Sequence, residues 1–403
     1  MISGGDTAWL LIASALVMLM TPGLAFFYGG MVRSKNVLNT LFLSFIALAV
    51  ISLEWTIIGY SMAFGNDIGG IIGKLNHFLL YGVGLQPSHN YATTVPALVF
   101  MIFQMMFAII TPALISGAVV ERMKFSAYIC FILLWGLFVY NPICHWVWAK
   151  GGWLNRLGAL DFAGGTVVHI NAGISALIIA LILGKRKGFP NADFVPHNLG
   201  LTAIGAGLLW FGWFGFNAGS ALGANKIAVL AFVTTHIAAA TASLSWILAE
   251  WIHIKKPSML GAVSGLVAGL VAITPAAGFV SPIGAIVIGI GAGIICYIAV
   301  LFKGRFGYDD SLDAFGVHGI GGIWGAIATG IFACHGAKGL LMGNVHQLFV
   351  QIIAVIASIG YAAFMTFIIV KVIDFVIGLR VEEDDEVMGI DLTIHGETGY
   401  KFI

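Results

Sequence analysis

The chain has 403 residues, of which 60% are hydrophobic and only 9% are charged. Soluble domains carry about 25% charged residues, so this composition cannot cover a water-facing surface and predicts an integral membrane protein. The formal net charge is +1, and the basic residues are scattered in twos and threes, which argues against nucleic acid as a partner. No loop is long enough for a soluble catalytic domain, so we expect one membrane domain and no enzymatic activity.

The apolar stretches predict the membrane-spanning helices. A span needs about 20 mostly apolar residues, and backbone amides in hydrocarbon must be paired within the helix. The chain shows no alternation typical of a barrel, so all spans are expected to be α-helices. Eleven segments qualify: 8–31, 37–64, 93–119, 125–143, 161–184, 199–219, 227–251, 259–275, 282–302, 314–334 and 346–378.

The basic residues of the loops predict the orientation. One set of alternate loops holds eleven of them: Arg33, Lys35, Arg122, Lys124, Lys185, Arg186, Lys187, Lys255, Lys256, Lys303 and Arg305. The other set holds five: Lys74, Lys150, Arg156, Lys226 and Lys338. The richer set should be cytoplasmic. This places the N-terminus outside the cell and the C-terminal tail on the cytoplasmic side of the cell membrane. No basic residue precedes the first span, so no cleaved signal is expected.

Eleven spans suit two five-span halves, the second inverted relative to the first, plus one extra helix. Two echoes indicate such a repeat: "AIITPA" at 108–113 returns as "VAITPA" at 271–276, and "FFYGGMVRSKN" resembles "FGFNAGSALGANK". We predict an all-α transport domain over 1–379, with pseudo-repeats at about 8–184 and 199–334 and an extra helix over 346–378. Residues 380–403 would form a cytoplasmic regulatory tail.

The fifth and tenth predicted spans each bury a histidine beyond an aspartate at their entry. His169 follows Asp161 in "DFAGGTVVHINAG", and His318 follows Asp313 in "DAFGVHGIGGI". At 1.5 Å per residue, the rings lie about 12 Å and about 8 Å inside the helix entries. The glycines around both rings would let the two helices approach closely. We therefore expect the rings to meet near the midplane.

Several interpretations fit a buried histidine pair. Single intramembrane histidines can act as packing contacts, but ionisable residues in spans are by default functional. Close glycine packing leaves little room for haem, and His145, His236 and His318 lack the spacing of a zinc site. A proton relay or the lining of a pore for a small polar molecule remains. In an apolar lumen both rings should be largely neutral, offering hydrogen-bond donors and acceptors to an uncharged molecule.

Aromatic residues indicate a cation site near the outer mouth. Phe103 and Phe107 lie four residues apart on the third predicted span, below an extracellular loop with the sequence "HWVWAKGGW" that carries Trp148. Phe216 and Ser220 end the sixth span. Aromatic faces can hold a desolvated cation, although an interfacial aromatic belt explains most of the tryptophans equally well.

The sequences "DFAGGTVVHINAG", "GFNAGSA", "DAFGVHGIGGI" and "GLRVEEDDEVMGIDLTIHGETGY" resemble the ammonium transporter (Amt/Rh) family, on its Amt branch. The resemblance covers nearly the whole chain. It implies a homotrimer with one narrow pore in each subunit and no cofactor. The implied roles are an outer ammonium site of Phe103, Phe107, Trp148, Ser220 and Asp161, a gate of Phe107 and Phe216, and a lumen lined by the hydrogen-bonded pair His169 and His318.

In this interpretation ammonium is recruited, loses its proton and passes as ammonia, with the proton crossing separately through the histidines. The acidic run 382–386 by itself could be only a solvated face. The resemblance implies instead that the tail docks on the cytoplasmic face, with Arg380 in the docking surface, and that this face binds a trimeric P-II signalling protein. Alternatives are an ammonium receptor, a passive Rhesus-type gas channel and a haem-bearing oxidoreductase.

Overall fold

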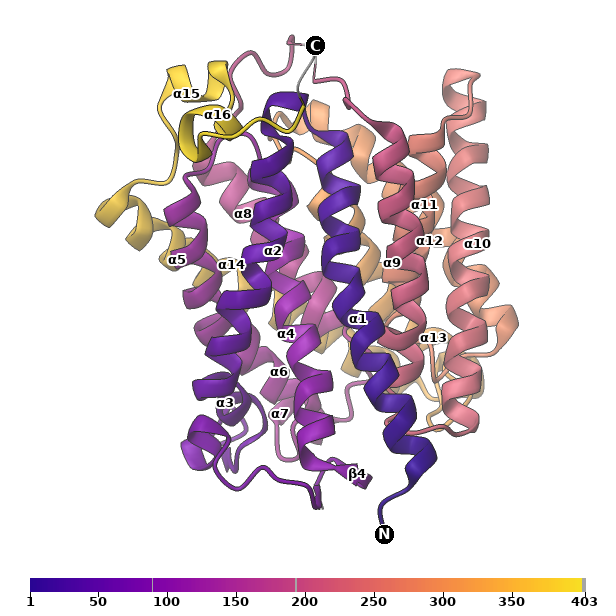
Figure 1. Ribbon diagram of the computed structural model, residues 1–403. Coiled ribbons are helices and arrows are strands. Elements are labelled where there is room, and N and C mark those ends of the chain that lie inside the picture. Colours follow the sequence, from indigo (N-terminus) through magenta and orange to yellow (C-terminus); the bar gives the residue numbers. More distant parts are fainter. Residues whose placement is uncertain (89, 193, 401–403) are drawn as a thin grey trace.

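The computed structural model describes residues 1–88, 90–192 and 194–400, and these form a bundle of long helices whose two termini lie at opposite ends (Figure 1). Ten helical stretches in this part of the chain are long and apolar enough to cross a membrane, and one shorter apolar helix, α11 (Met259–Ile273), accompanies them. The prediction of an all-helical membrane protein is therefore confirmed. The count of eleven spans, the inverted repeat and the orientation stay predictions. The last three residues of the predicted tail, 401–403, lie outside the described residues.

The first half of the bundle begins with α1 (Gly4–Met31) and with a continuous stretch of η1 (Ser34–Asn36), α2 (Val37–Glu54), η2 (Trp55–Gly59) and α3 (Tyr60–Phe64). A 3-10 segment, η3 (Leu75–Leu80), and two hairpins of short antiparallel strands follow, β1 (Asp67–Ile68) with β2 (Ile72–Gly73), and β3 (Pro87–Ser88) with β4 (Ala92–Pro96). The bundle continues with α4 (Ala97–Val119), α5 (Phe125–Trp135), η4 (Gly136–Tyr140), α6 (Asn141–Trp148), α7 (Trp153–Leu157), η5 (Gly165–Ile170) and α8 (Asn171–Leu183).

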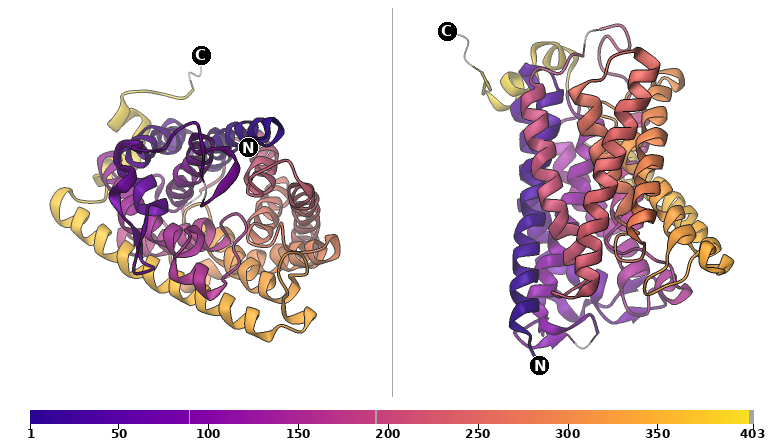
Figure 2. Two further views of the ribbon diagram at one scale, coloured as in Figure 1. Left: turned by 90° about the horizontal axis from the view of Figure 1, so that it is seen from below. Right: turned by 90° about the vertical axis from the view of Figure 1, so that its right-hand side faces the viewer.

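The second half contains α9 (Leu199–Gly219), α10 (Lys226–Ile254), α11, α12 (Pro282–Phe306), η6 (Phe315–Gly319) and α13 (Ile320–Phe332). After η7 (Leu340–Met342), the long helix α14 (Val345–Ile377) lies along the outer edge of the bundle (Figure 2). Two short helices, α15 (Glu383–Met388) and α16 (Ile390–His395), end the chain beside the start of α2 (Figure 1).

The two halves meet along α1 and α9, which pack side by side over much of their length. Glycines on α9 make this close approach possible. A Cβ at Gly205 would lie 2.2 Å from the backbone nitrogen of Phe27, and one at Gly215 would lie 2.7 Å from the carbonyl oxygen of Ala13. No side chain fits at these distances, so small residues fix how closely the halves pack.

Four of the helices contain a π-helical segment, namely η2, η4, η5 and η6. Such segments are rare and occur often at functional sites. Two of them, η5 and η6, carry His169 and His318. The other two, η2 and η4, lie next to the buried side chain of Glu54.

The fourth predicted span was too short. We expected it to end at residue 143, with the tryptophans beyond it in a loop, but helical structure runs on through η4 and α6, so Trp146 and Trp148 lie on α6. Pro142 lies within this continuous stretch, just after the π-helical segment η4.

Candidate functional site

Three cavities follow one another through the bundle. The outer cavity, named for the side that the predicted orientation places outside, has a volume of about 240 Å³ and is lined by Phe64, Asn90, Tyr91, Phe100, Gln104, Phe107, Trp148, Phe162, Ser220 and Leu222. A narrow lumen of about 10 Å³ has Phe216, Trp213, His169 and His318 in its wall. An inner vestibule of about 250 Å³ also has His318 in its wall, so this ring borders both inner cavities.

The outer cavity gathers three of the predicted ammonium-site residues, Phe107, Trp148 and Ser220. The rings of Phe107 and Trp148 meet edge to face with centroids 5.7 Å apart. The Ser220 hydroxyl donates to the carbonyl of Phe216 at 2.8 Å, which leaves its oxygen free to accept a hydrogen bond. An aromatic wall with hydroxyl acceptors suits a small cation that can donate hydrogen bonds.

The other two predicted members of the outer site do not line this cavity. Phe103 is fully buried behind Phe107, with ring centroids 4.9 Å apart, and packs against Gly219. Sequence reasoning missed Gln104, whose buried Oε1 lacks a hydrogen-bond donor and whose side chain faces the cavity. Its position between Phe103 and Phe107 in "FQMMF" was the available signal.

Asp161 acts on the backbone beside the cavity. Its carboxylate accepts hydrogen bonds from four successive amides, those of Gly164, Gly165, Thr166 and Val167, at 2.6–3.0 Å. Its carbonyl accepts the Trp148 indole N–H at 2.9 Å. The N-cap position itself is Gly164, in a left-handed conformation at φ 117° that favours glycine. Asp161 instead satisfies the whole first turn from three residues upstream.

Phe107 and Phe216 separate the outer cavity from the lumen. Their ring centroids are 4.2 Å apart, and both rings are buried. Phe107 faces the outer cavity, and Phe216 faces the lumen. The tilted ring pair therefore lies between the two spaces.

The two histidine rings meet in the lumen, as the sequence predicted. Their centroids are 5.4 Å apart, and the ring planes differ by 14°. His169 is also stacked between His318 and Trp213, whose centroid lies 5.4 Å from it. The implied hydrogen bond between the two rings is not formed, because neither nitrogen of His169 has a partner. Nearly parallel, stacked rings direct their in-plane N–H groups past each other.

Glycine contacts bring the two histidine-bearing segments together. A Cβ at Gly173 would lie 2.1 Å from the backbone nitrogen of Gly319, the residue after His318. Gly322 would meet Ile170, the residue after His169, at 3.0 Å. The backbones are thus in contact on either side of the ring pair, as the flanking glycines indicated.

On the His318 segment, the aspartate that corresponds to Asp161 is not the one we expected. We expected Asp313 to stand at the start of the tenth span, but the carboxylate that caps η6 is Asp310, which accepts the amides of Ala314 and Phe315 at 3.1 and 2.8 Å. Asp313 forms an ion pair with Lys303 instead. The missed signal is the spacing, since Asp310 precedes His318 by eight residues, as Asp161 precedes His169.

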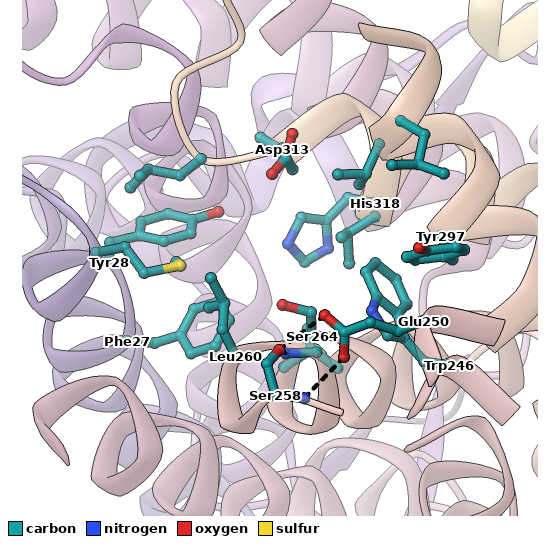
Figure 3. A pocket seen from close by; sticks show the side chains of 18 of the residues that line it. Phe27, Tyr28, Trp246, Glu250, Ser258, Leu260, Ser264, Tyr297, Asp313 and His318 are labelled. Carbon is teal, nitrogen blue, oxygen red and sulfur yellow. Dashed lines mark hydrogen bonds between the residues drawn. The ribbon is translucent and has the colours of Figure 1, made fainter. Parts of the chain in front are cut away.

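The inner vestibule is wider and more polar than the lumen. Figure 3 shows the His318 ring directed into it, with Asp313 to one side and Ser264 and Glu250 on the opposite wall. Glu250 accepts from the amide and hydroxyl of Ser258 at 2.9 and 2.8 Å. A molecule leaving the lumen past His318 enters a space with acidic and hydroxyl groups.

The loops at this end form a buried ionic cluster. Arg186 binds both carboxylate oxygens of Asp309 and donates to Glu121 at 2.7 Å, and Arg33 donates to the other Glu121 oxygen at 2.9 Å. Burial acts to raise the pKa of Glu121, but the nearby Arg186 and Arg33 outweigh it and hold the pKa below its usual value. The pKa of Asp309 is likewise lowered by Arg186 despite burial.

The tail docks beside this cluster, at Lys187 and the start of α2. Glu386 of α15 is buried and accepts from Arg380 at 2.7 Å and from the Lys187 amide at 2.6 Å. The Asp391 carboxylate accepts the amides of Leu38 and Asn39 at the start of α2. The acidic run is therefore not simply a solvated face, since one of its members anchors the tail.

Comparison with known proteins gives one consistent answer. Residues 8–400 match the model of the Ammonium Transporter Family. An ammonium transporter of Bacillus subtilis is 52% identical, covering 98% of both chains, and the ammonium transporter Amt1 of Archaeoglobus fulgidus is 52% identical, covering 99% of this chain and 100% of its own. The crystal structure of Candida albicans Mep2 superposes with a TM-score of 0.90 at 35% identity, covering 95% of this chain and 88% of that one. A solved structure described as a sensor Amt protein gives a TM-score of 0.90 at 30% identity, covering 97% and 98%.

Proposed function

The chain belongs to the ammonium transporter family, and we propose that it moves ammonium across the cell membrane by binding the cation in the outer cavity, removing its proton and passing neutral ammonia through the lumen. It is a membrane transporter and not an enzyme. The observation that carries the proposed mechanism is the order of the three cavities, in which an aromatic cation site leads through a phenylalanine pair to a lumen with two histidines.

Recruitment uses the faces of Phe107 and Trp148 together with two acceptors. A cation over desolvated aromatic faces gains about 2 kcal/mol. Ammonium can in addition donate to the Ser220 oxygen and to Gln104 Oε1, which has no other donor. Asp161 holds the neighbouring backbone and the Trp148 indole in place rather than lining the cavity.

Passage beyond the gate favours a neutral molecule. The lumen of about 10 Å³ is close to the smallest space that holds one water-sized molecule, and most of its wall is apolar. A cation that enters must leave its hydration shell, which is strongly unfavourable without compensating charge. Ammonium can avoid this cost by giving up its proton, whereas potassium cannot.

The histidine nitrogens provide the polar contacts of the lumen. Both His169 nitrogens and His318 Nδ1 lack hydrogen-bond partners, so they can donate to or accept from ammonia. We propose that the proton crosses separately along the same rings and is released into the inner vestibule, where Asp313 and Glu250 lie.

The assembly and regulation follow the family. We propose a homotrimer with one pore in each subunit, a cytoplasmic tail, and binding of a trimeric P-II-type protein at the end where α15 and α16 dock. The sensor Amt structure keeps an ammonium receptor as a second candidate function. Passive Rhesus-type gas conduction is the third, and it predicts no ammonium-dependent current.

The test is transport by purified protein in proteoliposomes, with currents recorded for ammonium, methylammonium and potassium. We expect ammonium-dependent currents without potassium current. Replacing both lumen histidines (His169→Ala with His318→Ala) should abolish the selectivity for ammonium over potassium. His236→Ala is the matched control, because His236 stacks on Trp210 away from the three cavities. Unchanged selectivity in the double variant would contradict the mechanism.

A further inference from the structure

Glu54 is a buried carboxyl inside the membrane domain that the transport path does not use. It ends α2, is 4% exposed, and lines none of the outer cavity, the lumen or the inner vestibule. None of the ion pairs formed by the described residues includes it. A charged carboxylate without a cation is very costly in such a place.

Its hydrogen bonds leave two acceptors without donors. The Asn141 amide donates to Glu54 Oε1 at 2.7 Å. Glu54 Oε2 and Asn141 Oδ1 are both buried and have no partner. Two unsatisfied acceptors on a pair already joined by one hydrogen bond indicate that a donor is missing between them.

The space around the carboxyl restricts what this donor can be. A Cβ at Gly59 of η2 would lie 2.6 and 2.8 Å from the two carboxylate oxygens, and one at Gly136 of η4 would lie 3.8 Å from Oε2. Two glycines in π-helical segments thus pack their backbones around the carboxyl group. The carboxyl group is therefore closely enclosed, which argues against a hydrated cation beside it.

We propose that Glu54 is a proton-binding site, holding a proton on Oε2 that it donates to Asn141 Oδ1. The carboxylic acid and the amide then form two reciprocal hydrogen bonds, which satisfies both side chains and removes the charge. Tyr140 of η4 is a further titratable group that interacts with Glu54, and its hydroxyl is buried. The proton stays bound through transport and joins the end of α2 to the start of α6.

Infrared spectroscopy of the full-length protein at neutral pH tests the proposal directly. The wild type should show a carboxylic-acid C=O band that is lost in Glu54→Gln, and the band should shift in Asn141→Leu because its hydrogen-bond partner is removed. Glu250→Gln is the matched control and should remove no such band, since both Glu250 carboxylate oxygens already accept hydrogen bonds from Ser258. Loss of a carboxylate band in Glu54→Gln would overturn the proposal.

Melting and transport give two further readouts. Glutamine is a neutral substitute that can donate to Asn141 Oδ1, so Glu54→Gln should melt within a few degrees of the wild type and retain ammonium uptake within about twofold. If sodium or ammonium raised the melting temperature of the wild type but not of Glu54→Gln, the carboxyl group would bind a cation in place of a proton. A large loss of uptake in Glu54→Gln would mean that the proton moves during transport. Either result would contradict a permanently bound proton.

Discussion

The two histidine-bearing segments, η5 with α8 and η6 with α13, use the same local design in different surroundings. In each segment an aspartate stands eight residues before the histidine, and its carboxylate accepts hydrogen bonds from backbone amides. Each then forms a π-helical segment. Asp161 satisfies four amides and forms no ion pair among the described residues, whereas Asp310 satisfies two and lies beside the Lys303–Asp313 pair.

The difference follows the cavities on either side. Beyond His169 toward the outside lie Phe216 and Phe107, while His318 opens into the inner vestibule. The side with the phenylalanine pair is stabilised by backbone hydrogen bonds and ring packing. The vestibule side is stabilised by ion pairs. We infer that selection occurs on the side of the phenylalanine pair and that the vestibule side serves release.

The largest expected contrast is between the two capping aspartates. Asp161→Ala leaves four buried amides unsatisfied and should destabilise the protein by about 4 kcal/mol or more, against about 2 kcal/mol for Asp310→Ala, at about 1 kcal/mol for each lost donor pairing. Thermal unfolding in detergent, followed by fluorescence, measures both. Equal losses would show that the two caps are equivalent.

The next contrast separates the histidines. His169→Ala opens the most enclosed part of the lumen and should lower the ratio of ammonium to potassium current at least tenfold, a change of about 1.4 kcal/mol. His318→Ala enlarges a space that already meets the vestibule, and we expect a smaller decrease. Current ratios for ammonium and potassium in proteoliposomes provide the measurement. A larger effect at His318 would place selection on the inner side.

A third contrast compares two serines. Ser220→Ala removes an acceptor from the outer cavity and should raise the half-saturating ammonium concentration about threefold to tenfold, as expected for one hydrogen bond. Ser264 lines the inner vestibule, and Ser264→Ala should leave this concentration unchanged. Concentration-dependent uptake tests the pair. Equal shifts would contradict recruitment at the outer cavity.

The smallest expected effect is the pH dependence of tail docking beside the buried ionic cluster. The pKa values of Glu121 and Asp309 are lowered in the folded state, so the stability they contribute is present above their ordinary pKa values, near 4, and is lost as pH falls through the lowered ones. As the pH falls, the tail should therefore be released before the hydrogen bonds of the Asp161 carboxylate are disrupted. Limited proteolysis of the tail between pH 7 and about pH 3 measures this. Arg186→Gln should flatten the dependence, and an unchanged profile would argue against the cluster.

The sequence predicted the helical spans closely because burial in lipid demands long apolar runs. The expected span 199–219 coincides with α9, and the expected 346–378 differs from α14 by one residue at each end. The errors occur where polar or special residues interrupt the pattern. The expected fourth span ended at residue 143, yet the helix runs on, and the side chains of Asn141 and His145 form hydrogen bonds to Glu54, Asp67 and the carbonyl of Ala63.

The candidate site was predicted in part. His169, His318, Phe107, Phe216, Trp148 and Ser220 lie along one path, as expected. Phe103 and Gln104 could not be distinguished, because adjacent helical residues point about 100° apart and only the neighbouring helices decide which one faces the cavity. The choice of Asp313 over Asp310 failed for a similar reason, since proximity in sequence does not show which carboxylate reaches the free amides.

Composition and hydrophobic runs thus determined by themselves that this chain is a helical membrane protein with two buried histidines, because lipid permits little else for such a sequence. Only the tertiary structure decided that the rings stack without a mutual hydrogen bond, that Asp161 and Asp310 are the matching caps, and that Glu54 faces Asn141. These outcomes depend on the angle and distance between helices far apart in sequence, which glycine contacts and side-chain packing set together.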